Sequence, residues 1–97
     1  MPTYEPTARF TADLDRFTPQ QRCRFHRVIT RAFVPDLRAG HFRAGLRAKG
    51  VRRAPGVYEL TWAGDDRATC QYGPELVRGA PHIVWRRIGT QDILTDS

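Results

Sequence analysis

The sequence predicts a single α+β domain in which N-terminal helices pack on one face of a small antiparallel sheet. Its 97 residues are enough for one hydrophobic core but not for two. Apolar residues recur at helical spacing in the first forty residues, whereas they alternate with polar residues between 57 and 88. Helices that come first and strands that follow are typical of helices gathered on one side of an antiparallel sheet.

One helix is clearly marked in the first half of the chain. Thr18 stands at its N-cap, Pro19 at its first residue, and Gln21 at the second position of a capping box. An apolar stripe follows at helical spacing, formed by Phe25, Val28, Ile29, Ala32 and Phe33. The opposite face is basic and carries Arg24, Arg27 and Arg31. Because Pro35 disfavours helical geometry at the residue before it, the helix is expected to end or kink there, with a short continuation that stops at Gly40.

Two segments before this helix are less clearly marked. Residues 1–7 contain two prolines and few apolar residues, which predicts a flexible arm in front of a single domain spanning 8–97. Residues 8–17 fit both helical and strand spacing, so periodicity leaves their structure open.

The second half of the chain reads as strands. Residues 57–62 alternate, residues 63–66 have turn chemistry, and residues 67–72 form the return strand of a hairpin. The most apolar strand, 82–88, is expected at the centre of the sheet. The face of the sheet away from the helices is left partly open, and in a domain this small we expect the ligand surface there.

The charge of the chain points to a polyanionic partner. Lys and Arg number 16 against 10 Asp and Glu, giving a net charge of +6, and Lys49 is the only lysine. Such a field attracts phosphate-rich molecules, and arginine suits phosphate oxygens and base edges, which makes RNA the leading candidate. The arginine bias has an equally good explanation in the base composition of a genome. The residues expected to bind RNA lie in a glycine-punctuated stretch and are Arg43, Arg47, Lys49, Arg52 and Arg53.

Other classes of protein fit poorly. No apolar run approaches the roughly 20 residues that span a bilayer, and the N-terminus lacks the pattern of a signal peptide, so we expect a cytoplasmic protein without a membrane partner. Cys23 and Cys70 are expected to be free thiols. The three histidines have no metal-ligand spacing, and no nucleotide-binding loop or Ser-His-Asp set is visible, so neither a metal nor a cofactor is expected.

Three short motifs carry a resemblance to a known family. They are Gly56-Val57-Tyr58-Glu59-Leu60, then Asp66-Arg67-Ala68-Thr69-Cys70-Gln71-Tyr72, and finally Trp85-Arg86-Arg87-Ile88-Gly89-Thr90-Gln91-Asp92-Ile93. Together with the order of the elements over residues 9–94, they resemble the RelE/ParE toxin superfamily of type II toxin–antitoxin systems. The Tyr-Glu-Leu strand is most similar to the HigB-like branch.

The resemblance implies a RelE-like fold and a toxin that blocks translation. Such a toxin is a metal-independent endoribonuclease, or mRNA interferase, that cuts mRNA on the ribosome and is neutralised by a cognate antitoxin protein. The ribose 2′-hydroxyl attacks the adjacent phosphate. That reaction needs a base for the hydroxyl, a cation for the charge that develops on phosphorus, and an acid for the leaving oxygen.

The resemblance also implies roles for single residues. Arg67 matches the arginine that faces the family's cleft, and Arg86 or Arg87 is a second cation, because strict alternation admits only one of the two to the open face. Glu59 is a candidate base or the partner of an ion pair. The residues after the last strand are Gln91, where relatives often have histidine, and Asp92, which is left as an acid–base group.

Several alternatives stay open at this stage. The same fold serves ParE-like inhibitors of DNA gyrase, which act by binding. Gln91 and Thr61 stand where a stronger catalyst would have ionisable groups, so a non-catalytic RNA-binding relative is a further alternative. Of the histidines, His41 lies in the basic stretch and is a further candidate base, whereas His82 at the start of a strand is expected to pack or lie at an edge.

Overall fold

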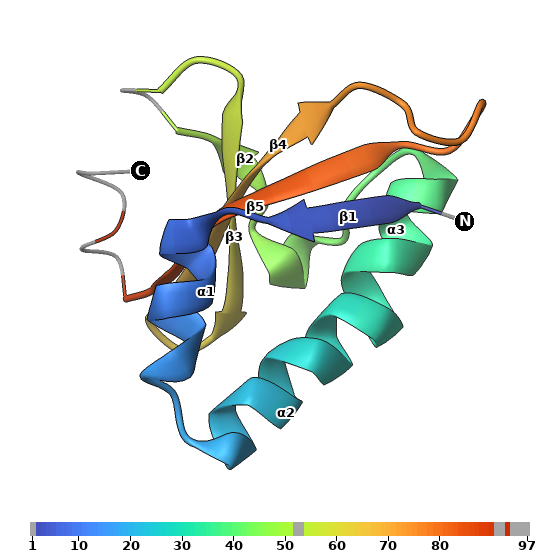
Figure 1. The fold of residues 1–97 in the computed structure, drawn as a ribbon. Helices are drawn as coiled ribbons and strands as arrows, with labels where there is room; N and C mark the ends of the chain where they lie inside the picture. The colour runs from blue at the N-terminus through green and yellow to red at the C-terminus, as the bar shows by residue number, and fades with distance from the viewer. Residues whose placement is uncertain (1, 52–53, 91–92, 94–97) are drawn as a thin grey trace.

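The computed structural model describes residues 2–51, 54–90 and 93 (Figure 1). Its helical elements are α1 (Ala8–Asp15), α2 (Pro19–Val28), the π-helical turn η1 (Ile29–Phe33), α3 (Val34–Ala39) and the 3-10 turn η2 (Ala44–Leu46). Its strands are β1 (Thr3–Pro6), β2 (Lys49–Gly50), β3 (Val57–Ala63), β4 (Asp66–Gly73) and β5 (His82–Gly89). The α+β class is therefore confirmed.

The five strands form one sheet in the order β1-β5-β4-β3-β2. The pairs β5–β4, β4–β3 and β3–β2 are antiparallel, as expected, whereas β1 runs parallel to β5. The sheet is thus mixed rather than purely antiparallel. β5, which was expected to be central, lies inside the sheet between β1 and β4, one place from its middle strand β4.

The flexible arm expected at residues 1–7 is wrong for the part that forms β1. Buried His82 on β5 holds this strand, because its Nδ1 lies 2.8 Å from Thr3 Oγ1 and its Nε2 lies 2.8 Å from Glu5 Oε1. Pro6 is tolerated because β1 is an edge strand. The prolines that suggested an arm are therefore compatible with a short edge strand.

The helix signals in the sequence correspond to real hydrogen bonds. Thr18 Oγ1 accepts from the Gln21 backbone N–H at 3.2 Å, and Gln21 Oε1 accepts from the Thr18 N–H at 2.8 Å, which completes the predicted capping box. Pro35 does not end the helix: the π-helical turn η1 precedes it and leads into α3, and the Val34 N–H donates to the Ile29 carbonyl five residues back. Gly40, with φ of 88°, ends α3.

The helices cover one face of the sheet, as predicted, and Trp85 of β5 lies at the centre of that contact. Ring centroids of Phe10 on α1, Phe25 on α2 and Phe33 on η1 lie 5.8, 5.5 and 5.3 Å from it. Aromatic pairs at such distances each add about 0.5–1.5 kcal/mol beyond the burial of their surface. Residues 8–17, which periodicity left open, thus belong to the helical layer.

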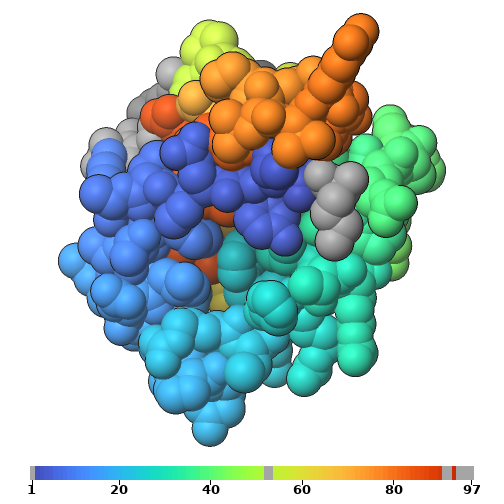
Figure 2. All heavy atoms as spheres, turned by 45° about the vertical axis from the view of Figure 1, so that its right-hand side comes forward, coloured from blue at the N-terminus to red at the C-terminus, as the bar shows by residue number. Residues whose placement is uncertain are grey.

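The helical layer does not close completely over β5. Figure 2 shows a hollow between the blue N-terminal segment and the teal helix, with part of β5 visible inside it. This groove has a volume of about 340 Å³, and Tyr4, Leu14, Phe25, Ile29 and Trp85 are among its lining residues.

Candidate active site

The candidate site lies on the face of the sheet away from the helices. Leu60, Ala68 and Cys70 belong to the core under the helices. Because side chains alternate along a strand, the residues next to them point to the other face. On β4 these are Arg67, Thr69 and Gln71. We call this surface the far face.

Four residues form a row across the far face. The strand register pairs Lys49 with Glu59, Glu59 with Thr69, and Thr69 with Arg87. Neighbouring strands lie about 4.8 Å apart, so the row spans three such steps. At one end Lys49 Nζ lies 3.4 Å from Glu59 Oε1. Three residues predicted for the site, Lys49, Glu59 and Arg87, therefore lie in one line.

A β-bulge in β5 corrects the prediction that only one of the paired arginines reaches this face. Thr69 pairs with Arg87 and Cys70 pairs with Trp85, so Arg86 is an extra residue between them. Arg86 Nη1 donates to Gln71 Oε1 at 2.6 Å, which places its guanidinium on the far face beside the row. Strict alternation failed because a bulge inserts one residue and re-aims its neighbours.

Arg87 is bound by Asp13, a residue that no sequence pattern identified. Its Nε and Nη2 donate to the two carboxylate oxygens of Asp13 on α1, at 2.6 and 3.2 Å, and the Ile88 backbone N–H donates to the same carboxylate at 3.2 Å. Burial raises the pKa of Asp13, but the bonds from Arg87 and Ile88 outweigh it and lower the pKa below its ordinary value. Asp13 has neutral neighbours and no motif around it, so no pattern could have identified it.

Arg67 lies in the next row, where it pairs with Thr61 on β3 and Gly89 on β5. Its Nη1 donates to the Gly64 carbonyl at 3.1 Å, so the guanidinium folds back over the β3–β4 turn. Arg67 and Thr69 are two residues apart on one face of the strand, which separates them by about 7 Å. Arg67 is thus near the row but not part of it.

The far face is more covered than expected. Thr69 is fully buried, and Val57 and Glu59 are buried as well. Ile93, after the last strand, is also buried, and a Cβ added to Gly89 would lie 2.9 Å from its Cγ2. The Thr69 hydroxyl has no hydrogen-bond partner among the described residues.

The residues expected to bind RNA fall into different environments. Arg43 is held by Asp36, which accepts from its Nε at 2.8 Å, its Nη2 at 2.9 Å and its backbone N–H at 2.8 Å. These bonds lower the pKa of Asp36 to about 2. Arg47 is exposed, and the side chain of Lys49 is 72% exposed.

The remaining expected residues contribute less to the described site. Arg52, Arg53, Gln91 and Asp92 lie outside the described residues. His41 is exposed, and His82 is buried against β1, as expected for a packing residue.

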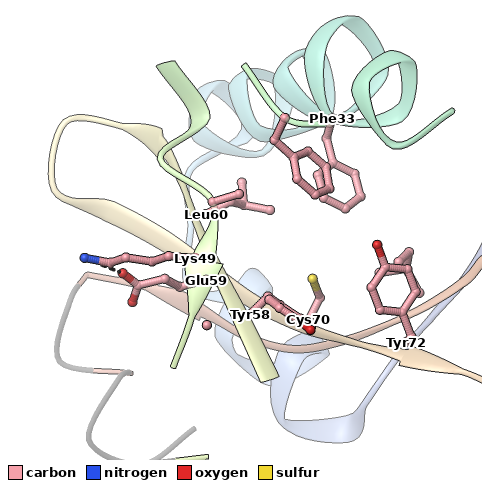
Figure 3. A pocket seen from close by; sticks show the side chains of 11 residues that line it. Phe33, Lys49, Tyr58, Glu59, Leu60, Cys70 and Tyr72 are labelled. Carbon is pink, nitrogen blue, oxygen red and sulfur yellow. Dashed lines mark ion pairs between the residues drawn. The ribbon is translucent and has the colours of Figure 1, made fainter. Parts of the chain in front are cut away.

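A cavity of about 240 Å³ lies on the helical side of β3 and β4 (Figure 3). Its walls include the stacked rings of Phe33 and Phe42, 5.4 Å apart, and the edge-to-face pair Tyr58 and Tyr72, 6.0 Å apart. Burial raises the pKa of the Cys70 thiol in its wall to about 12, so this thiol stays protonated. No pattern in the sequence indicates the cavity, because its walls come from segments far apart in the chain.

Metal-binding clusters and membrane-spanning helices are both absent from the part of the chain that the structure describes. Within 2–51, 54–90 and 93, no group of three or more His, Cys, Asp or Glu side chains is arranged to hold a metal ion. The helices of this part are all too short or too polar to cross a membrane. Cys23 and Cys70 are both free, as predicted, with Cys23 exposed.

Comparisons with known proteins extend the description of the fold. No protein-family model and no curated protein matches the sequence. Among solved structures, the E. coli DinJ–YafQ complex matches with a TM-score of 0.61 at 12% identity, covering 97% of this chain and 98% of that one. YafQ from E. coli matches with a TM-score of 0.58 at 14% identity, over the same shares of each chain. A YafQ mutant with glutamine in place of a histidine gives 0.59 at 11%. YafQ is a toxin of the RelE family, and the chain described here has the RelE-like fold that the sequence motifs implied.

Proposed function

We propose that this protein is the toxin of a type II toxin–antitoxin system and that it cuts mRNA on the ribosome. The observation that carries the proposal is the row Lys49–Glu59–Thr69–Arg87, flanked by Arg86 on the same face. A carboxylate and two guanidinium groups share this row and its flank, with Glu59 and Arg87 two strand spacings apart, and they are the kinds of group that cleavage by the 2′-hydroxyl requires as base and cations.

Each step of the proposed reaction has a candidate group. Glu59 takes the proton of the 2′-hydroxyl while the 2′-oxygen forms a bond to phosphorus. Arg87 and Arg86 stabilise the negative charge that develops on the phosphoryl oxygens. The bond from phosphorus to the 5′-oxygen then breaks, and that oxygen takes a proton, for which Asp92 is the candidate in the sequence. The products are a 2′,3′-cyclic phosphate and a 5′-hydroxyl.

The net charge and its distribution support an RNA substrate. Lys49, at one end of the row, and Arg47, two residues before it, are exposed, and Arg52 and Arg53 follow them in the sequence. We expect cations of this stretch to contact phosphates on either side of the cut, which positions the strand without reading its sequence.

A cognate antitoxin is part of the proposal. The DinJ–YafQ structure is a complex, and the match to a chain of that complex covers 97% of the present chain. By analogy, we propose a protein partner that covers the basic surface and blocks access of mRNA.

The test is induction of the chain in bacteria, with growth and the integrity of messages as readouts. The wild-type protein should arrest growth and leave cut messages. Arg87→Ala should reduce cutting about 10²–10³-fold, as does loss of one group that stabilises developing charge. Arg24→Ala, which removes the same charge from the exposed face of α2, is the matched control and should keep full activity.

The outcome also separates the alternatives. Growth arrest with intact messages and inhibited supercoiling by purified gyrase would replace the proposal with a ParE-like inhibitor. Salt-sensitive RNA binding without cutting would indicate a non-catalytic relative.

A further inference from the structure

Where β1 ends, residues of helix α1 and its N-cap contact the edge of β5. The pairing of β1 with β5 stops at Trp85, and the Thr7 N–H donates to the Trp85 carbonyl at 2.9 Å. Beyond it, Thr7 Oγ1 donates to the Arg86 carbonyl at 2.9 Å, and Asp13 accepts from the Ile88 N–H. Side chains of α1 and its N-cap therefore satisfy edge groups of β5 on both sides of the bulge.

Asp13 binds the guanidinium of Arg87 as well as the backbone of β5. The two side chains are only 9% and 15% exposed, and two separate guanidinium nitrogens are engaged. A forked contact of this kind fixes the direction of the guanidinium plane, which a single hydrogen bond does not. The backbone bond to Ile88 then ties that direction to the strand.

We propose that Asp13 is a positioning residue that aims Arg87 at the scissile phosphate. This inference rests on the proposed function, in which Arg87 contacts the reacting group. A catalytic group must be held to within about 0.5 Å of its productive place. The strand register pairs Arg87 with Thr69 of the far face, and Asp13 on α1 holds the Arg87 guanidinium at the edge of β5.

The test compares Asp13→Asn with the wild-type full-length chain on ribosome-bound mRNA. Asparagine keeps one oxygen for the Ile88 N–H but removes the charge and the second oxygen. Because a misplacement of 1 Å can cost about 10²-fold, we expect cutting at saturating mRNA to fall by about 10–100-fold, with a smaller change in KM. In the Arg87→Lys protein, which lacks the fork, the same substitution should change cutting by less than about twofold.

Asp36→Asn is the matched control. Asp36 also binds two guanidinium nitrogens and a backbone N–H, but it does so for Arg43 beside α3. Asp36→Asn should lower the free energy of unfolding and leave the rate of mRNA cutting unchanged. The NMR signal of the Arg87 Nε–H gives a second readout, and it should broaden in Asp13→Asn and stay sharp in Asp36→Asn.

Each outcome decides the question. Equal cutting by Asp13→Asn and wild type, or an equal fall in the wild-type and Arg87→Lys backgrounds, would overturn the positioning role and leave the proposed function standing. If Asp13→Asn does not fold, Asp13→Glu replaces it: glutamate keeps the charge and both oxygens on a side chain one methylene longer, so it displaces the guanidinium, and cutting should again fall in the wild-type background but not in Arg87→Lys. Intact messages with the wild-type protein would overturn the proposed function itself, and the role of Asp13 with it.

Discussion

At the scale of single residues, two arginines with similar carboxylate partners differ in their place on the sheet. Arg43 and Arg87 are each held by a carboxylate through two guanidinium nitrogens, but only Arg87 lies in the row with Glu59. Motif resemblance identified Glu59 and Arg87 as site candidates. It gave no reason to single out Asp13, because a buried acidic partner has no pattern of its own in a sequence.

The pair of Asp36 and Arg43 should make the stability of the fold depend on pH in the acid range. The pKa of Asp36 in the folded chain is about 2, below its ordinary value of 3.8, so its contribution is complete above pH 4. That contribution is lost as the pH falls from about 4 to 2. The wild-type chain should therefore be more stable than Asp36→Asn at pH 7, and the gap should narrow towards pH 2. Urea unfolding across this range measures it, and a gap that does not change with pH would contradict the assignment.

At the scale of elements, the long and well-punctuated segments were predictable and the short ones were not. The capping box of α2 and the β3–β4 hairpin rest on local chemistry, and the structure confirms them. Pro35 is accommodated by the π-helical turn η1 before it. β1 was missed because four residues with a proline carry too little periodicity. The bulge in β5 was missed because two adjacent arginines look the same in either register.

His82 contacts β1 through Thr3 and Glu5, so its removal should destabilise the fold. His82→Ala removes partners from Thr3 and Glu5 and leaves a gap in the buried end of β5, so the free energy of unfolding should fall by about 1–3 kcal/mol. His41→Ala, at an exposed position, is the control and should change it by less than about 0.5 kcal/mol. Denaturant unfolding of both variants provides the comparison. A fall in His82→Ala no larger than in the control would show that β1 is not held through this histidine.

At the scale of the whole molecule, the order of elements predicted more of the fold than any single motif. Helices followed by strands led to the correct layer architecture, and the RelE-like fold agrees with the YafQ structures at only 11–14% identity. The aromatic cavity and the coverage of the far face were beyond reach, because both depend on contacts between segments distant in the chain. The proposed function rests on the positions of the charged residues on the far face.

The most direct test of that claim is the chemistry of the RNA ends. Purified protein is added to ribosomes carrying a defined mRNA, and the new termini are identified by mass spectrometry. Cleavage by the 2′-hydroxyl predicts upstream fragments with a 2′,3′-cyclic phosphate and downstream fragments with a 5′-hydroxyl. Glu59→Gln should slow their formation about 10²–10⁴-fold, as expected for loss of a general base. Fragments that begin with a 5′-phosphate, or cutting that Glu59→Gln leaves unchanged, would contradict the account.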